Sequence, residues 1–341
     1  MKEISLRSSY LGDEPVTTIY FGGGTPSLLK ASEIDQIINE IARFHTIESK
    51  AEITLEANPE DLNKKGYLRD LSASMVNRLS IGVQSFNDED LVYMNRVHSA
   101  EEAELALRKS LDTGFQNLSV DLIYGTPSLS DAQWRRNIEK VVSLDIPHIS
   151  SYCLTVEPKT VLFDQIRKGK VRDIDDERSN IHFEISVEML EKEGYVNYEL
   201  CSFCKEGFMA EHNSNYWKGK DYLGLGPSAH SYNQHSRGSN VSNNNEYIAN
   251  LNAGQLAITE EELSSSDKYN DYVMLSLRTI WGLSLEHIKE SYGDEFAAHC
   301  KSEMLPYLAS DWIFFSNAVY TLTGKGKLFA DQIASDLFIV E

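Results

Sequence analysis

The feature that most constrains the fold is a strand-like run that stops abruptly in glycine. The β-branched and aromatic residues Thr17–Phe21 are followed by Gly22-Gly23-Gly24, Thr25 and Pro26. Such residues favour strands, whereas glycines permit a left-handed backbone and leave main-chain groups open to a ligand. A tight turn from strand to helix, with no ligand, is the alternative. The segment therefore predicts a strand whose carboxyl end either grips a polar small molecule or simply turns.

Three further segments of the first half have the same build, in which a short apolar run ends in polar residues. They are Ala51–Pro59, Arg78–Phe86 and Leu118–Pro127. Helical patterns lie between these runs, over Ser32–Ile41, Glu101–Leu111 and Asp131–Leu144. Ser32 is a credible N-cap, and apolar residues three and four apart follow it. The alternation predicts an α/β fold with a parallel sheet, right-handed crossovers and helices outside.

The polar residues at the ends of these runs form a candidate site. In a closed or partly closed barrel of parallel strands, the ligand sits at the carboxyl ends of the strands. Gly23, Glu56, Gln84 and Asp121 all occupy that position in this interpretation. Each of them alone is also typical of a solvated loop or a strand cap. Their joint occurrence favours a site at which the four converge.

The order of the motifs resembles a known family. Gly-Gly-Gly-Thr-Pro, Glu-Ala-Asn-Pro, Ile-Gly-Val-Gln-Ser-Phe, Met-Asn-Arg-Val-His and Val-Asp-Leu-Ile-Tyr-Gly-Thr-Pro follow one another. The series looks like that of the radical S-adenosylmethionine enzymes related to oxygen-independent coproporphyrinogen III oxidase. Residues 211–217 and 222–231 are more similar to the branch called HemW, whose members are regarded as heme chaperones. The resemblance covers nearly the whole chain and implies a truncated partial TIM barrel with a small, mainly helical carboxyl-terminal domain.

The resemblance also implies boundaries. Residues 1–205 would form the partial barrel without its first βα unit, because Lys2–Gly12 looks like the tail of the helix that follows that unit. Residues 206–265 would be a loop-rich connection, in which Arg237–Asn245 reads as an exposed or mobile loop. Residues 266–341 would hold three helices, a short hairpin and a final helix, a winged-helix-like order.

The family implies a binding site for S-adenosylmethionine, lined here by Gly23, Gly24, Thr25, Glu56, Gln84, Arg96, Asp121 and Cys153. The two glycines and the threonine would hold the amino and carboxylate end of the cofactor. The chemistry agrees, because such a ligand needs backbone acceptors, a guanidinium for its carboxylate, and carboxylates or amides for ammonium and hydroxyl groups. For Arg96 a surface arginine is the alternative, and for Cys153 a buried structural cysteine.

The HemW resemblance implies heme as cargo. The motif His-Asn-x-x-Tyr carries over to His212, Asn213 and Tyr216. A neutral imidazole can ligate heme iron, and Tyr216 and Trp217 offer planar surface for a porphyrin. His230 is a second candidate. Alternatively, His212 and Asn213 only pin an irregular loop by hydrogen bonds.

The cysteines depart from the family pattern. Enzymes of this family hold a 4Fe-4S cluster with Cys-x-x-x-Cys-x-x-Cys, which is missing from a chain whose cysteines are Cys153, Cys201, Cys204 and Cys300. One Cys-x-x-Cys completes neither a cluster nor a zinc site. We therefore expect no metal site in this chain and a cluster only in a full-length parent. An amino-terminal truncation and a genuine loss of the cluster both stay open.

Composition narrows the function classes. A net charge of −20 and a pI near 4.9 argue against nucleic acid as a partner, because a phosphate backbone demands clustered lysine and arginine. No apolar run approaches a membrane span, and the absence of a signal-peptide profile favours the cytoplasm. Three functions remain: a carrier that hands heme to apo-proteins, an oxidase that decarboxylates coproporphyrinogen III, and an inactive scaffold. Enzymatic activity and a dimeric state are left open.

Overall fold

The computed structural model describes residues 1–340 and divides into two compact units. Unit 1 combines the start of the chain with its last third, over residues 1–17, 37–49 and 211–341. Unit 2 holds residues 18–36 and 50–210. Every residue predicted to bind S-adenosylmethionine lies in unit 2, whereas every residue predicted to bind heme lies in unit 1.

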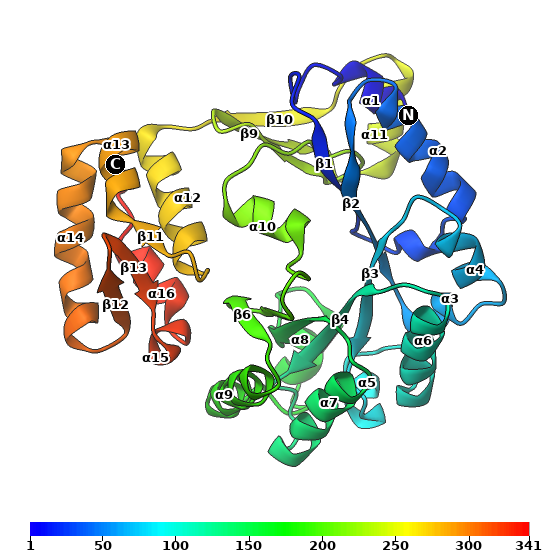
Figure 1. Cartoon of the computed structure of the whole chain (residues 1–341), viewed down its shortest axis with the longest axis horizontal. Helices are drawn as coiled ribbons and strands as arrows, with labels where there is room; N and C mark the ends of the chain where they lie inside the picture. Colours follow the sequence, from blue (N-terminus) through cyan, green and yellow to red (C-terminus); the bar gives the residue numbers. More distant parts are fainter. Residues whose placement is uncertain (341) are drawn as a thin grey trace. The chain divides into compact units, whose positions relative to one another are not determined.

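A curled seven-stranded sheet dominates unit 2 (Figure 1). Its strands run in the order β1 (Val16–Phe21), β2 (Ile47–Ala57), β3 (Arg78–Gln84), β4 (Asn117–Tyr124), β5 (His148–Cys153), β7 (Ser202–Cys204) and β6 (Val196–Glu199). Strands β2 to β5 pair in parallel, while β7 is antiparallel to both β5 and β6. The predicted α/β fold with a parallel sheet is thus confirmed, with an antiparallel hairpin added at one edge.

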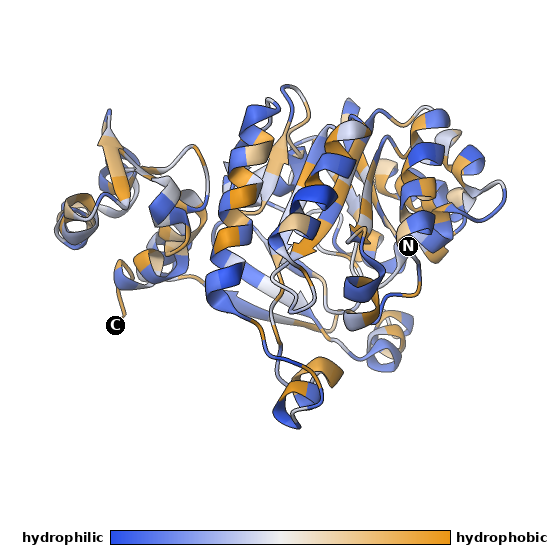
Figure 2. Ribbon diagram, turned by 90° about the horizontal axis from the view of Figure 1, so that it is seen from below, coloured by the Kyte–Doolittle hydropathy of each residue, from blue (hydrophilic) through white to orange (hydrophobic). Residues whose placement is uncertain are grey.

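Helices connect and cover the strands of this sheet (Figure 1). They are η1 (Pro26–Leu28), α2 (Ala31–Ala42), α3 (Pro59–Leu62), α4 (Tyr67–Ser72), α5 (Asp88–Tyr93), α6 (Ala100–Asp112), α7 (Asp131–Ser143), α8 (Val161–Arg167) and α9 (Asp176–Lys192). Capping boxes begin α6 at Ser99 and α7 at Ser130, and satisfy amides that the first turn leaves unpaired. Hydrophobic and hydrophilic residues alternate along the helices (Figure 2), as expected where one face packs on a sheet.

One part of unit 1 is built on a small antiparallel sheet, β10 (Ile258–Glu262), β9 (Ser236–Asn240) and β8 (His230–Tyr232). Helices α1 (Lys2–Leu6), α10 (Glu211–Trp217) and α11 (Asn244–Asn252) belong to the same unit. The prediction of a mobile loop over Arg237–Asn245 is wrong, because β9 is the central strand of this sheet. Residues 211–217, predicted to be part of a loop-rich region, form a helix.

A buried carboxylate ties the first helix to this sheet. One oxygen of Glu3 accepts hydrogen bonds from the Gly226 amide at 2.8 Å and from the Tyr247 hydroxyl. The other accepts from the Asn240 side-chain amide at 2.6 Å, and the Arg7 guanidinium lies 3.8 Å away. Burying a carboxylate is tolerated when it is hydrogen-bonded in this way. The start of the chain is therefore fastened to segments more than 220 residues later.

The last elements of the chain form a helical bundle with a three-stranded sheet. The helices are α12 (Ser265–Leu277), α13 (Leu285–Tyr292), α14 (Asp294–Ala309), α15 (Gly324–Lys327) and α16 (Ala330–Asp336). The sheet is ordered β11 (Leu283–Ser284), β13 (Val319–Leu322) and β12 (Ile313–Ser316). Tyr269, Val273, Leu283 and Ile288 lie at its core. Three helices, a hairpin and final helices occur in the predicted order. Within residues 1–340, no helix is long and apolar enough to cross a membrane.

Candidate functional site

The glycine run follows β1 and presents open backbone. Gly23 and Gly24 have φ of +71° and +79°, and a side chain added at either would meet no atom within 4 Å. Gly22 differs, since a Cβ there would lie 2.6 Å from Tyr20 and 2.9 Å from Glu56. Gly22 therefore makes room for a pair of neighbouring side chains, while the next two glycines supply a left-handed turn with free space beside it.

Glu56, near the end of β2, fixes this turn. Its Oε1 accepts a hydrogen bond from the Tyr20 hydroxyl at 2.8 Å, and its Oε2 accepts one from the Gly23 amide at 3.1 Å. Burial first, and the Glu56 charge second, raise the pKa of Tyr20, so that the phenol stays a donor. Thr25 lies at the entrance of η1, where its carbonyl accepts from the Leu28 amide.

Asp121 lies on β4 beside two serine hydroxyls. Ser80 donates to it at 3.3 Å from β3, and Ser150 donates from β5. Burial raises the pKa of Asp121 from 3.8 to about 6, and the Glu56 charge adds to the rise while Ser150, Arg78 and Ser80 oppose it. Asp121 and Glu56 therefore influence one another, and both also act on Tyr20. This cluster is a partly buried, negatively charged spot in unit 2.

Replacing Asp121 with asparagine is expected to stabilise the protein at high pH only. Because the pKa of Asp121 is raised to about 6 in the folded state, the native protein binds a proton that the unfolded chain has released. Stability is then lost as the pH rises through about 4 to 6, and Asp121→Asn removes that loss. A gain of about 1–3 kcal/mol is expected at about pH 8 and almost none near pH 4. Urea unfolding at both pH values checks it, and an equal effect at the two would contradict it.

Gln84 is the last residue of β3, and Arg96 lies shortly after helix α5. Gln84 has φ +66°, the left-handed region, and its side-chain nitrogen lies 2.8 Å from where a Cβ on Gly82 would be. Burial lowers the pKa of Arg96, whereas Glu60 and Asp121 act to raise it. Among the described residues no carboxylate lies within ion-pairing distance of the Arg96 guanidinium. This cation is thus free to take a carboxylate from a ligand.

Cys153 ends β5 and packs against backbone. Its sulfur lies 3.6 Å from the position of a Cβ on Gly125, and burial raises the pKa of its thiol. A raised thiol pKa disfavours the reactive thiolate. Cys153 is half-buried, and both its structural alternative and its role beside a cofactor stay predictions.

Sequence reasoning missed three residues that shape this region. Tyr20 bridges to Glu56, His98 bonds the Val83 carbonyl at 3.0 Å, and Asp90 is a fully buried carboxylate. His98 closes the Met-Asn-Arg-Val-His motif, which was a usable signal. Asp90 lies within Asn-Asp-Glu-Asp, which reads as an exposed acidic turn, so nothing in the sequence marked it.

The His-Asn-x-x-Tyr motif lies on α10 of unit 1. His212 Nε2 is 3.1 Å from the Tyr216 hydroxyl, and the two rings meet edge to face at 5.0 Å. Tyr216 in turn contacts Tyr222 at 4.6 Å, and Tyr222 stacks on Tyr232 at 5.9 Å. Asn213 lies between His212 and Tyr216 in the sequence and is partly exposed. The motif therefore begins a row of aromatic rings that reaches strand β8.

His230 opens β8 and is placed differently. Its side chain is exposed, while its backbone carbonyl approaches Gly224 so closely that a Cβ there would lie 2.0 Å from the oxygen. No ring contact joins His230 to His212 in the described residues. The structure thus brings His212 and Tyr216 together and leaves His230 outside that pair.

Metal ligands do not converge in the part of the chain that is described. Residues 1–340 contain no group of three histidine, cysteine or acidic side chains able to hold a metal ion. Cys153 and Cys204 lie on β5 and β7, Cys201 in the turn before β7, and Cys300 on α14. Within residues 1–340, none of the four cysteines forms a disulfide.

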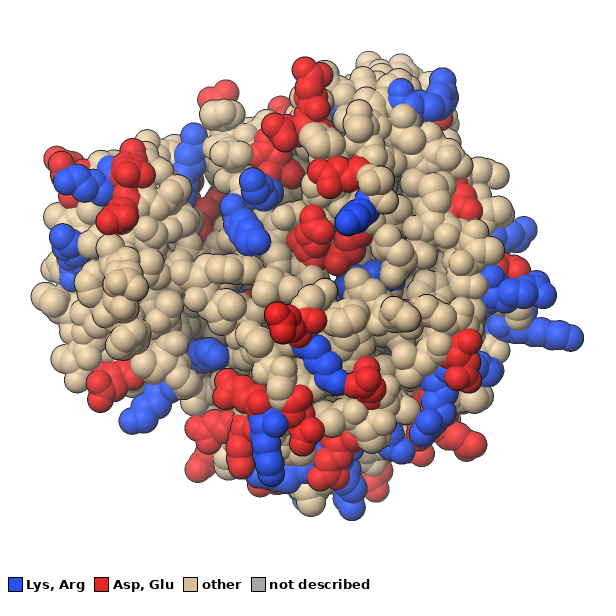
Figure 3. All heavy atoms as spheres, viewed as in Figure 1, with Lys and Arg blue, Asp and Glu red and all other residues tan. Residues whose placement is uncertain are grey.

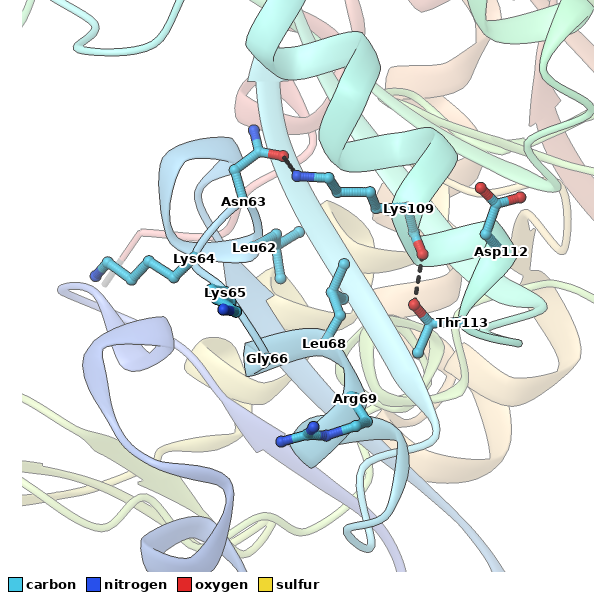
Figure 4. A pocket seen from close by; sticks show the side chains of 10 residues that line it. All are labelled: Leu62, Asn63, Lys64, Lys65, Gly66, Leu68, Arg69, Lys109, Asp112 and Thr113. Carbon is cyan, nitrogen blue, oxygen red and sulfur yellow. Dashed lines mark hydrogen bonds between the residues drawn. The ribbon is translucent and has the colours of Figure 1, made fainter.

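A cavity of about 310 Å³ lies apart from the predicted site, between the α3–α4 loop and α6 (Figure 4). Lys64, Lys65, Arg69 and Lys109 line it, but Lys64 pairs with Asp61 and Lys109 bonds Asn63. None of the predicted site residues lines this cavity. On the face drawn in Figure 3, acidic side chains are interspersed among the basic ones.

Known proteins resemble this chain along most of its length. A model of the Radical SAM superfamily matches residues 3–141. The heme chaperone HemW of Bacillus subtilis is 31% identical over 324 residues, 94% of this chain and 85% of that protein. HemW of Escherichia coli is 30% identical over 98% of this chain and 86% of that protein. The structure of coproporphyrinogen III oxidase (HemN) from Escherichia coli, a radical SAM enzyme, superposes with a TM-score of 0.83 at 23% identity, over 99% of this chain and 81% of that one. The predicted partial-barrel fold is thereby confirmed.

Proposed function

Because this chain belongs to the HemW family within the radical SAM superfamily, we propose that it binds heme and transfers it to heme-accepting apo-proteins. The observation that carries the proposal is the placement of His212 and Tyr216 together on α10, with Tyr216 38% exposed. An imidazole beside accessible aromatic surface is suited to a planar, iron-containing ligand. Membership also confirms the family that the motifs indicated.

The proposal includes an S-adenosylmethionine site in unit 2. Gly23, Gly24 and Thr25 would hold the amino-acid end of the cofactor, and Arg96 its carboxylate. Glu56, Gln84 and Asp121 would line the remainder, with Cys153 behind Gly125. The open space beside the two left-handed glycines and the unpaired guanidinium both fit such a ligand. When bound, the sulfonium cofactor supplies a positively charged group that Asp121 and Glu56 would stabilise.

The cysteines of this chain do not fit a 4Fe-4S cluster. Such clusters are held by converging cysteine thiolates, and the four cysteines of this chain are dispersed over both units. The cysteines of residues 1–340 therefore do not form the ligand set of such a cluster.

The hydrogen bond at His212 bears on how iron would be ligated. In the structure Nε2 is 3.1 Å from the Tyr216 hydroxyl, and a nitrogen in a hydrogen bond must exchange that partner for iron. Burial raises the pKa of Tyr216 to about 12, so the hydroxyl remains neutral and able to donate. Ligation through Nε2 thus requires Tyr216 to yield, which makes Tyr216 a modulator of affinity in this proposal.

Replacing His212 with alanine is expected to weaken hemin binding by about 10- to 100-fold. Loss of an iron–imidazole bond should cost on the order of 1–3 kcal/mol, while the tyrosines at positions 216, 222 and 232 remain. Absorption titration with hemin would measure the affinity and a shift of the Soret band. Circular dichroism would verify that the variant folds.

Two matched variants sharpen this test. Tyr216→Phe removes the hydroxyl that occupies Nε2 and is expected to keep or raise hemin affinity, with the Soret band of an imidazole ligand retained. His230→Ala is expected to have a smaller effect than His212→Ala, because His230 lies outside the ring pair. Identical curves and spectra for wild type and His212→Ala would overturn the assignment of His212.

A further inference from the structure

The backbone of Gln84 is the most informative strained position in unit 2. It is the one predicted cofactor residue other than glycine with positive φ, at +66°, and it is only 7% exposed. Left-handed backbone at a residue with a side chain persists only where the surrounding structure holds it, and such positions gather at functional sites. The contacts on either side of Gln84 identify what holds it.

On the amino-terminal side, the Val83 carbonyl is held twice. The Ser85 amide donates to it at 2.9 Å, across Gln84, and His98 Nε2 lies 3.0 Å from the same oxygen. His98 is buried, and its Nδ1 lies 3.2 Å from a carboxylate oxygen of Glu60. His98 thereby links the end of β3 to helix α3.

On the carboxyl-terminal side, the fully buried Ser85 hydroxyl is the centre of a hydrogen-bond network. It donates to Asp90 at 2.9 Å and accepts from the Asn137 side chain at 3.0 Å and from the Asn87 amide at 3.1 Å. Asp90 also accepts from Thr126 at 2.8 Å and from Ser128 at 2.5 Å, both in the loop after β4. The ends of β3 and β4 are therefore locked together one residue beyond Gln84.

These contacts orient the side chain of Gln84, which ends in an amide. Gln84 folds across Gly82, and Asn58 lies beside the same glycine, 3.6 Å from the position of its absent Cβ. The carboxyl end of β3 lies between those of β2 and β4, where Glu56 and Asp121 are found. An amide held there can form hydrogen bonds with a ribose hydroxyl or with the edge of the adenine base of an adenosyl ligand.

We infer that His98 and Ser85 are positioning residues that hold Gln84 in its left-handed conformation, and that an adenosyl ligand is bound by the Gln84 amide only while both hold it. The inference rests on the proposed S-adenosylmethionine site. Neither His98 nor Ser85 needs to contact the ligand for this effect. Their effect on binding must therefore pass through the Gln84 side chain.

Equilibrium dialysis with S-adenosylmethionine, combined with thermal unfolding, tests this coupling. Gln84→Ala is expected to weaken binding about 10-fold, and His98→Ala and Ser85→Ala about 3- to 10-fold each, with lower melting temperatures. The same two substitutions are then made in a Gln84→Gly background. Glycine adopts positive φ without cost, so there they should lower the melting temperature as before but leave the dissociation constant unchanged.

Ser110→Ala is the matched control, because Ser110 is also a buried serine, on α6, whose hydroxyl donates to the Ala106 carbonyl at 2.8 Å. It should lower stability without altering S-adenosylmethionine affinity. Equal losses of affinity from His98→Ala in both backgrounds would overturn the inference, as would unaltered binding by Gln84→Ala. A wild-type chain with no saturable binding would overturn the S-adenosylmethionine site together with it, while the hemin titrations of His212 would stand on their own.

Discussion

Replacing Asp90 with alanine is expected to lower the free energy of unfolding by about 3–5 kcal/mol, a large part of the stability of an ordinary domain. Asp90 is 0% exposed and accepts hydrogen bonds from four side chains, those of Ser85, Asn87, Thr126 and Ser128. Ser85 and Thr126 are buried, and Asn87 and Ser128 are half-buried. Alanine removes the acceptor of all four donors, and each buried donor left unsatisfied costs about 1–3 kcal/mol before relaxation. Urea unfolding followed by circular dichroism would measure the loss.

Glu89→Ala is the matched control, since Glu89 is the preceding acidic residue of the same helix and is exposed. It is expected to change stability by no more than about 0.5 kcal/mol. Asp90→Asn, which keeps the shape and one acceptor oxygen, should fall between the two. If Asp90→Ala and Glu89→Ala were equally stable, the hydrogen bonds accepted by Asp90 would not stabilise the fold.

A comparable loss is expected from Gly224→Ala in unit 1. A Cβ at Gly224 would lie 2.0 Å from the His230 carbonyl oxygen and 2.8 Å from the His230 nitrogen. Both obstacles are backbone atoms, so the strand must move. The cost should reach or exceed the upper end of the ~1–3 kcal/mol that overpacking usually causes. Thermal unfolding would detect it, and amide hydrogen exchange would place it in strand β8.

Gly324→Ala provides the comparison for that substitution. Gly324 begins α15, and an added Cβ there meets no atom within 4 Å. Alanine is a better helix residue than glycine by roughly 1 kcal/mol in a helix interior, so Gly324→Ala is expected to be neutral or stabilising. If Gly324→Ala lost as much stability as Gly224→Ala, the loss at position 224 could not be attributed to the close approach of the His230 backbone.

The first half of the fold could be predicted because its pattern is local. Strands such as Arg78–Gln84 are runs of buried residues, and the helices between them carry caps and apolar faces. Strand β9 was missed because Ser-Arg-Gly-Ser-Asn has no strand-favouring residue. It becomes a strand through pairing on both sides, with β8 and β10. Helix α10 was missed for a related reason, since its histidine, serine and asparagines are weak helix formers.

The sequence identified some residues of the candidate site but not the contacts that support them. Residues that end strands, such as Glu56 and Asp121, could be found by position. The supporting contacts could not, because Tyr20 pairs with Glu56 across 36 residues and Thr126 bonds Asp90 across the same number. A lone tyrosine or aspartate carries no mark of such a partner in the sequence. The left-handed backbone of Gln84 is equally hidden, because glutamine is not a residue that favours it.

The buried Glu3 has a consequence for how this chain is made. A ribosome synthesises residues 18–36 and 50–210, the whole of unit 2, before Gly226, Asn240 and Tyr247 exist to receive the Glu3 carboxylate. Domains fold as units, earlier ones first during synthesis. The Glu3 side chain must therefore wait for these three partners while the strands of unit 2 assemble. Translation order thus makes unit 1 close after unit 2.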